Sequence, residues 1–567
     1  ILIDALKHAL RCIKFMSTNI SKEKRERLVQ KINAIKTYIS SAAQDENTAQ
    51  LLTYIADIEK DIKGKKYGLV FEEHREGIDE VLENNLPVLT EDTDLFIDNG
   101  GQMNFLIEGD NLASLKLLEK THKGRIDLVY IDPPYNTGNK DFVYDDSFVD
   151  SNDTFRHSKW LSFMGKRLQI ARNLLSEKGV IFISIDDNEQ AQLKLLCDSI
   201  FNEQNYVALF QWRKRTAKSD VPYGISQDCE SILCYANSNF RAAIKGRERK
   251  YYETPDFPNK PWRFHDLTKQ TTIEERPNSN FNIVNPKNGD IFPVNPLRSW
   301  AITEETFEYY YKKNRIIFPG DYPFLSISKP VLRYWKEDDL KKAGDDFGLV
   351  AASTYLPSDI VGMTQDGTKE ITEIFATKIF SFPKPINLIK YIIDISTAKA
   401  HDATILDFFA GSGTTGHAVM KLNAEDGGSR KFIVCTNNEN NICRDVTYER
   451  IKRVIAKEDY KASLKYFKVD YLPISDKLYY EYADELLLHI RELVELENGI
   501  NFNGNVEIAI VLTEKELDDF TQNIPETCKA IYVGHDVLPT EEQEKIFAKR
   551  KIKVNVIPEY YYRDLEG

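Results

Sequence analysis

The fold of this chain is decided by the stretch Val129-Tyr130-Ile131-Asp132-Pro133-Pro134-Tyr135-Asn136-Thr137-Gly138. The residues from Ile126 to Ile131 are rich in β-formers and predict a buried strand, which the two prolines then end. In an open α/β sheet, ligands bind at the carboxyl ends of the strands. The sequence therefore predicts that a carboxylate, a proline-constrained carbonyl and an aromatic ring lie together at such an end.

These three groups suit a flat base that carries an exocyclic amine. Asp132 and the Pro133 carbonyl can both accept hydrogen bonds from the amine, and Tyr135 can stack on the ring. The alternative is a strand that ends in a Pro-Pro turn, with Asp132 capping a neighbouring backbone group. Asp-Pro-Pro-Tyr alone does not decide between these two interpretations.

A second strand and turn favour the first interpretation. Residues 404–417 predict a strand followed by a glycine-rich turn that fits the pattern GxGxxG. A further strand is predicted at residues 431–435, and Glu439 after it could bind ribose hydroxyls. The glycine turn by itself would suggest a nicotinamide or flavin enzyme, so the pairing of the two motifs carries the argument.

The pair resembles the amino-methyltransferases of DNA, which combine Asp-Pro-Pro-Tyr with Phe-x-Gly-x-Gly. The catalytic motif precedes the cofactor motif by about 270 residues, which resembles the β group of adenine-N6 enzymes. The chain looks most like the modification subunit of type III restriction-modification systems. The matching stretches are residues 66–72, 107–111, 132–138, 183–187, 382–385 and 406–419.

The resemblance implies a Rossmann-like α/β fold that depends on S-adenosylmethionine, with permuted motif order. It also implies methyl transfer to N6 of an adenine flipped out of double-stranded DNA. It assigns catalysis to Asp132, Pro133, Pro134 and Tyr135. It assigns cofactor binding to Asp110, Asn111, Lys384, Asp407, Phe409, Ala410, Gly411, Ser412, Gly413, Thr414, Thr415 and Glu439.

Several of these assignments have structural alternatives. By resemblance, Asp110 accepts a bond from the amine of the cofactor adenine, but Asp110 or Asn111 could also cap the helix predicted from about residue 112. Lys384 borders the cofactor in the family, although a lysine before proline can be plain surface. Thr414 and Thr415 are expected to offer N–H and hydroxyl groups to the cofactor carboxylate.

The 567 residues are too many for a single core, so several domains are expected. The regular alternation of strands and helices stops in the middle of the chain, where the sequence fits an inserted target-recognition domain. The expected divisions are a helical region at 1–95, the catalytic half of the sheet at 96–239, the insertion at 240–355, the cofactor half at 356–470 and a small α/β domain at 471–567.

The formal charge of −13 is unevenly distributed. Residues 211–270 hold 12 Lys or Arg against 7 Asp or Glu, whereas residues 471–567 carry a net charge of −10. Basic residues interleaved with aromatic ones such as Trp262 suit phosphates and bases, with a solvated basic loop as the alternative. The expected DNA-binding residues are Arg213, Lys214, Arg215, Arg247, Arg249 and Lys250.

The remaining features concern partners and location. The acidic C-terminal segment carries none of the motifs and is expected to form a homodimer. No nuclease or helicase motif is present, so DNA cleavage would require a separate restriction subunit. Scattered cysteines, no signal peptide and no apolar run of about 18 residues predict a cytoplasmic protein without membrane contact.

No metal site is expected, because methyl transfer needs none. Asp186 and Asp187 are interpreted as loop and helix-cap residues. Three other functions stay open: N4-cytosine methylation, methylation of RNA or of a protein glutamine, and DNA recognition for a separate nuclease without catalysis.

Overall fold

The computed structural model describes residues 20–41, 46–63, 71–138, 143–144, 147–150, 152–216, 224–246, 248–474, 488–502, 505–534 and 537–557. The chain divides into two compact units, residues 1–73 and 74–567. In the first unit, α2 (Ile20–Ser41) and α3 (Glu46–Lys63) form a hairpin in which Lys36 pairs with Glu59. These helices confirm the helical prediction for residues 20–41 and 46–63, whereas residues 1–19 lie outside the described part of the chain.

The second unit is built on a ten-stranded sheet with the order β1-β22-β2-β21-β20-β3-β6-β8-β7-β19. The strands from β22 to β6 are parallel to one another, and β8 runs antiparallel to both β6 and β7. In sheet order, the strands are β1 (Asn85–Glu91), β22 (Ala462–Pro473), β2 (Gln102–Glu108), β21 (Lys431–Thr436), β20 (Thr404–Asp407), β3 (Ile126–Ile131), β6 (Leu175–Ile185), β8 (Cys229–Ala236), β7 (Tyr206–Arg213) and β19 (Tyr355–Leu356).

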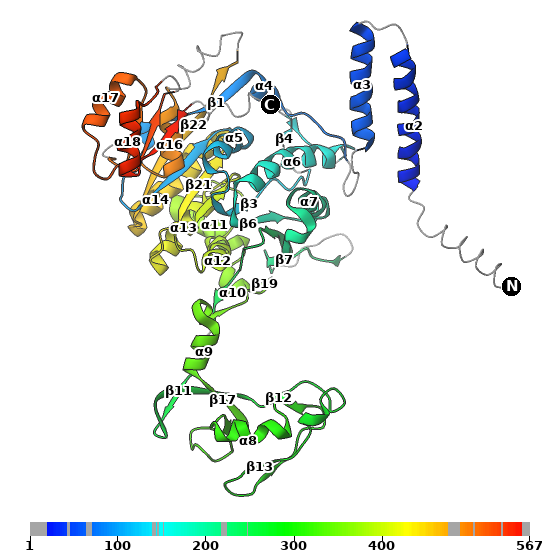
Figure 1. Ribbon diagram of the computed structural model, residues 1–567, viewed down its shortest axis with the longest axis vertical. Coiled ribbons are helices and arrows are strands. Elements are labelled where there is room, and N and C mark those ends of the chain that lie inside the picture. Colours follow the sequence, from blue (N-terminus) through cyan, green and yellow to red (C-terminus); the bar gives the residue numbers. More distant parts are fainter. Residues whose placement is uncertain are drawn as a thin grey trace, which may run out of the picture. The chain divides into compact units, whose positions relative to one another are not determined.

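Helices cover both faces of this sheet (Figure 1). Successive side chains of a strand point to opposite faces, so each inner strand contributes to two cores. Leu128 and Tyr130 of β3 belong to the core beneath α12 and α13, whereas Val129 and Ile131 between them are buried on the other face. The covering helices are α5 (Asn111–His122), α6 (Arg156–Leu174), α7 (Gln190–Cys197), α12 (Ile386–Thr397), α13 (Thr414–Asp426) and α14 (Glu449–Glu458).

Strands β3 and β20 are neighbours in space although they lie far apart in the sequence. Leu128 pairs with Ile405 and Val129 with Leu406 in a parallel ladder. The carboxyl ends of β2, β21, β20 and β3 therefore open at the same edge of the sheet. The Asp132 turn and the glycine turn therefore meet at one edge of the sheet.

The middle of the chain forms a small all-β core with a helix. Its four strands have the order β10-β11-β17-β16, and Trp262 of β11 is fully buried among them. The guanidinium carbon of the buried Arg333 lies 4.6 Å from the Trp262 ring centroid. Trp262 thus fills the core and is not available to bases. The elements are β10 (Tyr252–Thr254), β11 (Phe257–Asp266), α8 (Glu304–Lys312), β16 (Ile316–Ile317) and β17 (Val331–Trp335).

Two domain limits differ from those expected from the sequence. Strand β1 lies inside the region expected to be helical, yet it extends the main sheet by pairing with β22. Strand β22 runs beyond residue 470, and α16 (Ile490–Asn498) packs on α5 and β1. Lys465 of β22 pairs with Glu495 of α16 at 2.6 Å, and both side chains are buried. The edge strand and α16 bury their apolar sides on the sheet, so both belong to the main domain.

The end of the chain has its own core, as the alternating pattern predicts. Three parallel strands, β23 (Ile508–Val511), β24 (Ala530–Val533) and β25 (Lys553–Val556), alternate with α17 (Glu514–Gln522) and α18 (Glu541–Arg550). Their buried side chains form a separate apolar cluster. Within the residues that the structure describes, no helix is long and apolar enough to cross a membrane.

Candidate active site

The Asp-Pro-Pro-Tyr motif, residues 132–135, begins where β3 ends. The carboxylate of Asp132 accepts hydrogen bonds from Lys384 Nζ, which lies 2.8 Å from each oxygen. The Tyr135 hydroxyl donates to Asp132 Oδ1 at 2.8 Å. Trp160 of α6 donates from its indole nitrogen to the Pro134 carbonyl at 2.7 Å. The turn is therefore held from two sides, with the Asp132 carboxylate at the pocket.

Glu230 and Lys214 complete the charges of this pocket. Glu230, in β8, lies 3.5 Å from Lys384 Nζ and accepts a bond from Lys214 Nζ at 3.1 Å. Burial alone would lower the pKa of Lys384, but the carboxylates of Asp132 and Glu230 outweigh it and raise that pKa. Burial would raise the pKa of Glu230, and the two lysines lower it instead. The pocket thus balances two ammonium groups against two carboxylates.

Lys384 connects the two motifs in a way that the sequence did not indicate. Its side chain, which was expected beside the cofactor, reaches the Asp132 carboxylate. Its backbone carbonyl lies 3.4 Å from the Thr414 hydroxyl of the glycine turn. Pro383 and Pro385 restrict the backbone on either side, and Pro385 is the N-cap of α12.

The glycine turn depends on backbone conformations that suit glycine. Gly411 and Gly413 have φ angles of +49° and +75°. A Cβ at Gly413 would lie 3.2 Å from the Thr447 side chain. Below the turn, Asp407 accepts bonds from the Phe409 N–H at 2.9 Å and from the Thr415 hydroxyl at 2.5 Å. Burial raises the pKa of Asp407 to about 7 despite these two donors.

The hydroxyl groups at the start of α13 are used inside the protein. Thr415 donates to Asp407, while Thr414 and Ser412 accept bonds from Arg450 Nη1 at 2.7 and 3.1 Å. Ala410 and these three hydroxyl residues are buried, whereas Phe409 and Gly411 are half-buried. The hydroxyl groups shape the turn, so the part that remains open to a ligand is the half-buried Phe409 and Gly411.

Asp110 caps a helix, as one of the two interpretations predicted. Its Oδ1 accepts a bond from the Leu112 N–H at 2.7 Å. Its Oδ2 lies 3.6 Å from Arg167, a buried residue of α6 that also donates to the Asn111 side chain. The Asp110 side chain keeps 34% of its surface exposed, so capping leaves room for a ligand. Glu439 is exposed just beyond β21.

Residues 126–449 match the DNA methylase family. The chain belongs to this family. It is 36% identical to the Mod subunit of the type III restriction-modification enzyme StyLTI of Salmonella typhimurium, a match that covers 64% of this chain and 58% of that subunit. It is 34% identical to the type II methyltransferase M.KpnI of Klebsiella pneumoniae, over 58% of this chain and 79% of that enzyme. The methylase thus spans less than two thirds of the Salmonella subunit.

Solved structures of two methyltransferases are also similar to this methylase. The PvuII DNA methyltransferase (cytosine-N4-specific) aligns with 65% of this chain and 97% of its own, at 12% identity and a TM-score of 0.31. The M1.HpyAVI complex with S-adenosylmethionine aligns with 62% of this chain and 98% of its own, at 13% identity and a TM-score of 0.28. The family match itself contains both turns that meet at the sheet edge.

The basic residues expected to bind DNA fall into two groups. Of the group in the insertion, Arg247 lies outside the described residues. Arg249 is half-exposed, with Nη1 3.7 Å from Asp339. Lys250 is exposed, and its Nζ lies 5.0 Å from the Tyr252 ring centroid. Both described residues of this group present positive charge at the surface.

The second group follows β7 toward the catalytic pocket. Arg213 and Arg215 are both half-buried, and Arg215 donates to the Gln227 carbonyl at 3.1 Å. Lys214 between them pairs with Glu230, so its charge is committed to the pocket. Phosphate contact by Arg213 and Arg215 therefore stays a prediction.

The acidic pair that follows β6, Asp186 and Asp187, was expected to lie in a loop and to cap a helix. Asp186 accepts bonds from the Asn188 N–H at 2.9 Å and from its side-chain amide at 2.8 Å. This agrees with the prediction of a loop role. In the described part of the chain, no group of three or more His, Cys, Asp and Glu residues could hold a metal ion.

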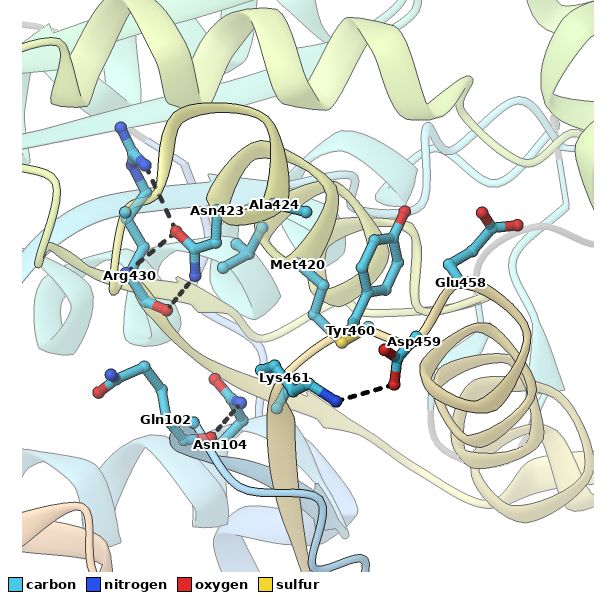
Figure 2. Close-up of a pocket in the computed structure, with 14 residues that line it drawn as sticks. Gln102, Asn104, Met420, Asn423, Ala424, Arg430, Glu458, Asp459, Tyr460 and Lys461 are labelled. Carbon is cyan, nitrogen blue, oxygen red and sulfur yellow. Dashed lines mark hydrogen bonds and ion pairs between the residues drawn. The ribbon is translucent and has the colours of Figure 1, made fainter.

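A separate hollow of about 300 Å³ lies at the amino ends of the parallel strands. It is lined by residues at the starts of β2 and β22 and by α13 and the segment after α14. Figure 2 shows Gln102, Tyr460 and Lys461 around it, with Lys461 paired to Asp459 at 2.9 Å. None of the predicted site residues lines this hollow. It lies at the other edge of the sheet from the two motifs.

Proposed function

We propose that this chain transfers a methyl group from S-adenosylmethionine to N6 of an adenine flipped out of double-stranded DNA. The observation that carries the proposal is that the Asp132 pocket and the glycine turn end the neighbouring strands β3 and β20. Membership of the DNA methylase family supports the same reaction class.

The residues at this edge fit the cofactor. S-adenosylmethionine, when bound, supplies an electrophilic methyl group on a positively charged sulfur. A side chain at Gly411 or Gly413 would be strained and crowded, as expected where a backbone must approach a ligand closely. The carboxylates of Asp110 and Glu439 follow β2 and β21 and suit an adenine amine and ribose hydroxyls. Phe409 would pack beside the ligand.

The Asp132 pocket fits the acceptor amine. Adenine N6 is a poor nucleophile because its lone pair is delocalised into the ring. Hydrogen bonds to Asp132 and the Pro133 carbonyl would draw N6 toward tetrahedral geometry and free that pair. The gain comes from orientation and charge placement. Stacking on Tyr135 would return roughly 1–3 kcal/mol of the few kcal/mol that flipping costs.

The present pocket also indicates what base entry requires. Lys384 Nζ donates hydrogen bonds to both carboxylate oxygens of Asp132. The target amine can bind there only after the ammonium moves. Glu230, at 3.5 Å, is the nearest carboxylate that could receive it. The mechanism therefore includes a shift of Lys384 toward Glu230 when the base arrives.

The wider assembly belongs to the same proposal. Similarity to the StyLTI Mod subunit supports a modification and recognition subunit of a type III restriction-modification system. On this proposal residues 240–355 contain the target-recognition domain, the chain works as a homodimer, and a separate helicase-nuclease subunit performs restriction.

The deciding experiment maps modified bases on DNA from cells that express the wild type or Asp132→Ala. We expect N6-methyladenine at one fixed sequence with the wild type and none with the variant. N4-methylcytosine would reassign the acceptor base. Unmodified DNA with the wild type would refute the proposal. Specific DNA binding by Asp132→Ala, measured on the mapped sequence, is the control for correct folding.

A further inference from the structure

A buried polar cluster lies behind the catalytic turn. Asn136 directly follows Tyr135, is 1% exposed and has a φ of +57°. Its side-chain nitrogen donates to Glu189 Oε1 at 2.5 Å. Glu189, just before α7, is fully buried, and its Oε1 also lies 2.6 Å from His157 Nδ1 of α6. Glu189 therefore ties the catalytic turn to α6.

The hydrogen bonds around His157 indicate where its proton lies. Arg156 Nε donates to His157 Nε2 at 3.2 Å, so Nε2 is an acceptor. In a neutral imidazole the other nitrogen, Nδ1, then carries the hydrogen and donates to Glu189 Oε1. Burial and the charge of Arg156 lower the pKa of His157, which favours this neutral ring.

Two oxygens in the cluster lack donors. Among the residues that the structure describes, Glu189 Oε2 and Asn136 Oδ1 are both buried without a hydrogen-bond partner. If Glu189 were ionised, both atoms would be unpaired acceptors, which is an expensive arrangement in a protein interior. A single proton on Oε2 turns one of them into a donor. The Asn136 amide already faces this carboxyl group through its nitrogen.

We propose that Glu189 is a positioning residue held as the neutral acid, which donates its proton to Asn136 Oδ1 and so locks the turn that carries Asp132 and Tyr135. An amide and a carboxylic acid can join through two parallel hydrogen bonds, one from N–H and one from O–H. This pair holds Asn136 in its left-handed conformation and fixes the direction of the preceding Tyr135. The activity readout below rests on the proposed methyl transfer.

The lock is sensitive to alkaline pH. The groups that face Glu189 are His157 and Arg156 from α6, Asp186 from the loop after β6 and the Asn136 amide. Burial raises the pKa of Glu189 to about 8; Asn136 and Arg156 lower it and Asp186 raises it further. As the pH rises through this value, the O–H donor is lost and the turn loosens.

The first test needs no substrate. Infrared or carboxyl carbon-13 spectra of the full chain are recorded from pH 6 to pH 10, for the wild type and Glu189→Gln. We expect a protonated carboxyl signal at pH 7 that titrates near pH 8 and is missing from the variant. Spectra at pH 7 that do not differ between the two proteins would overturn the proposal, whether or not the chain methylates DNA.

The second test uses methylation of the mapped sequence. Glu189→Gln replaces O–H with N–H, so we expect more than half of the wild-type kcat at pH 7 and no alkaline decline near pH 8. Glu189→Asp pulls the carboxyl away from Asn136, and we expect kcat to fall at least tenfold with KM for S-adenosylmethionine within twofold. Glu177→Gln, at an exposed position, is the matched control and should match the wild type throughout.

Two results would contradict the lock. One is a Gln variant that loses as much kcat at pH 7 as the Asp variant, because a charged carboxylate would then be needed. The other is an Asp variant with wild-type kcat and pH profile. If neither variant folds, the titration of the wild-type carboxyl signal still decides.

Discussion

The ion pair between Asp132 and Lys384 should stabilise the fold as well as prepare the site. Lys384 Nζ lies 2.8 Å from both carboxylate oxygens, and the two side chains are 10% and 28% exposed. Removal of one partner from a fully buried pair costs roughly 3–5 kcal/mol, because the other charge is left uncompensated. Asp132 is partly hydrated and Glu230 remains beside the ammonium, which reduces this figure to about 2–3 kcal/mol.

The prediction is tested with Asp132→Asn, Lys384→Met and the double variant. Each single change should lower the free energy of unfolding by about 2–3 kcal/mol, and the double variant should lose about 1–2 kcal/mol less than the sum. Urea unfolding can be followed by tryptophan fluorescence, since Trp160 bonds the catalytic turn and the Trp212 ring lies 5.7 Å from Lys384 Nζ.

Lys390→Met is the matched control for this cycle. Its ion pair with Glu425 lies nearer the surface, so we expect a change below about 1 kcal/mol. A coupling energy near zero between Asp132 and Lys384 would refute the buried pair. Asp132→Asn should also abolish methyl transfer, and a variant that methylates at the wild-type rate would remove Asp132 from catalysis.

Four further predictions follow from the site and its surroundings. Gly413→Val should weaken S-adenosylmethionine binding at least tenfold in calorimetry without DNA, because the position has a φ of +75° and a crowded Cβ direction; unchanged affinity would place the cofactor elsewhere. The pKa of Asp407 is raised from 3.8 to about 7, so between these values the folded chain keeps a proton that the unfolded chain releases. The free energy of unfolding should therefore fall as the pH rises from about 4 to 7. Asp407→Asn should remove that decline when melting temperature is plotted against pH, and parallel plots for the variant and the wild type would contradict the raised pKa. Replacement of Arg249 and Lys250 with Ala should reduce the slope of log K against log salt by about two units, and an unaltered slope would locate DNA on another surface. Truncation after residue 502 should leave a folded methylase that no longer dimerises in light scattering, and a truncated chain that stays dimeric would exclude the C-terminal domain from the interface.

The choice of residue 502 reflects what the structure adds to the sequence. A cut at residue 470 would sever β22, which runs to Pro473, and remove Glu495 from the buried Lys465. Strand β1 and helix α16 join the main sheet through long-range packing. A local pattern of apolar residues does not reveal which surface such an element will cover.

The catalytic motif and the glycine turn could be predicted because both are local. Each combines a strand with the turn that ends it, and a parallel sheet brings such ends to one edge. Glu230, Arg167 and Glu189 could not be found in this way. They lie in ordinary strands, helices and connections, and they reach the site only through packing between distant segments. The only hint of Glu230 in the sequence is weak: it is an acidic residue just before the apolar run of β8.

The insertion between the two halves of the sheet leaves and returns through a narrow passage. Ile244–Lys245 (β9) pairs antiparallel with Leu349–Val350 (β18), and the Gly246 N–H donates to the Gly348 carbonyl at 2.8 Å. A Cβ at Gly246 would meet the Val350 side chain at 2.8 Å, so a larger residue there would displace that side chain. The described residues of the insertion between β9 and β18 thus form a loop closed by this two-stranded neck. Related chains that keep this neck could exchange the inserted segments while the turns at the sheet edge stay untouched.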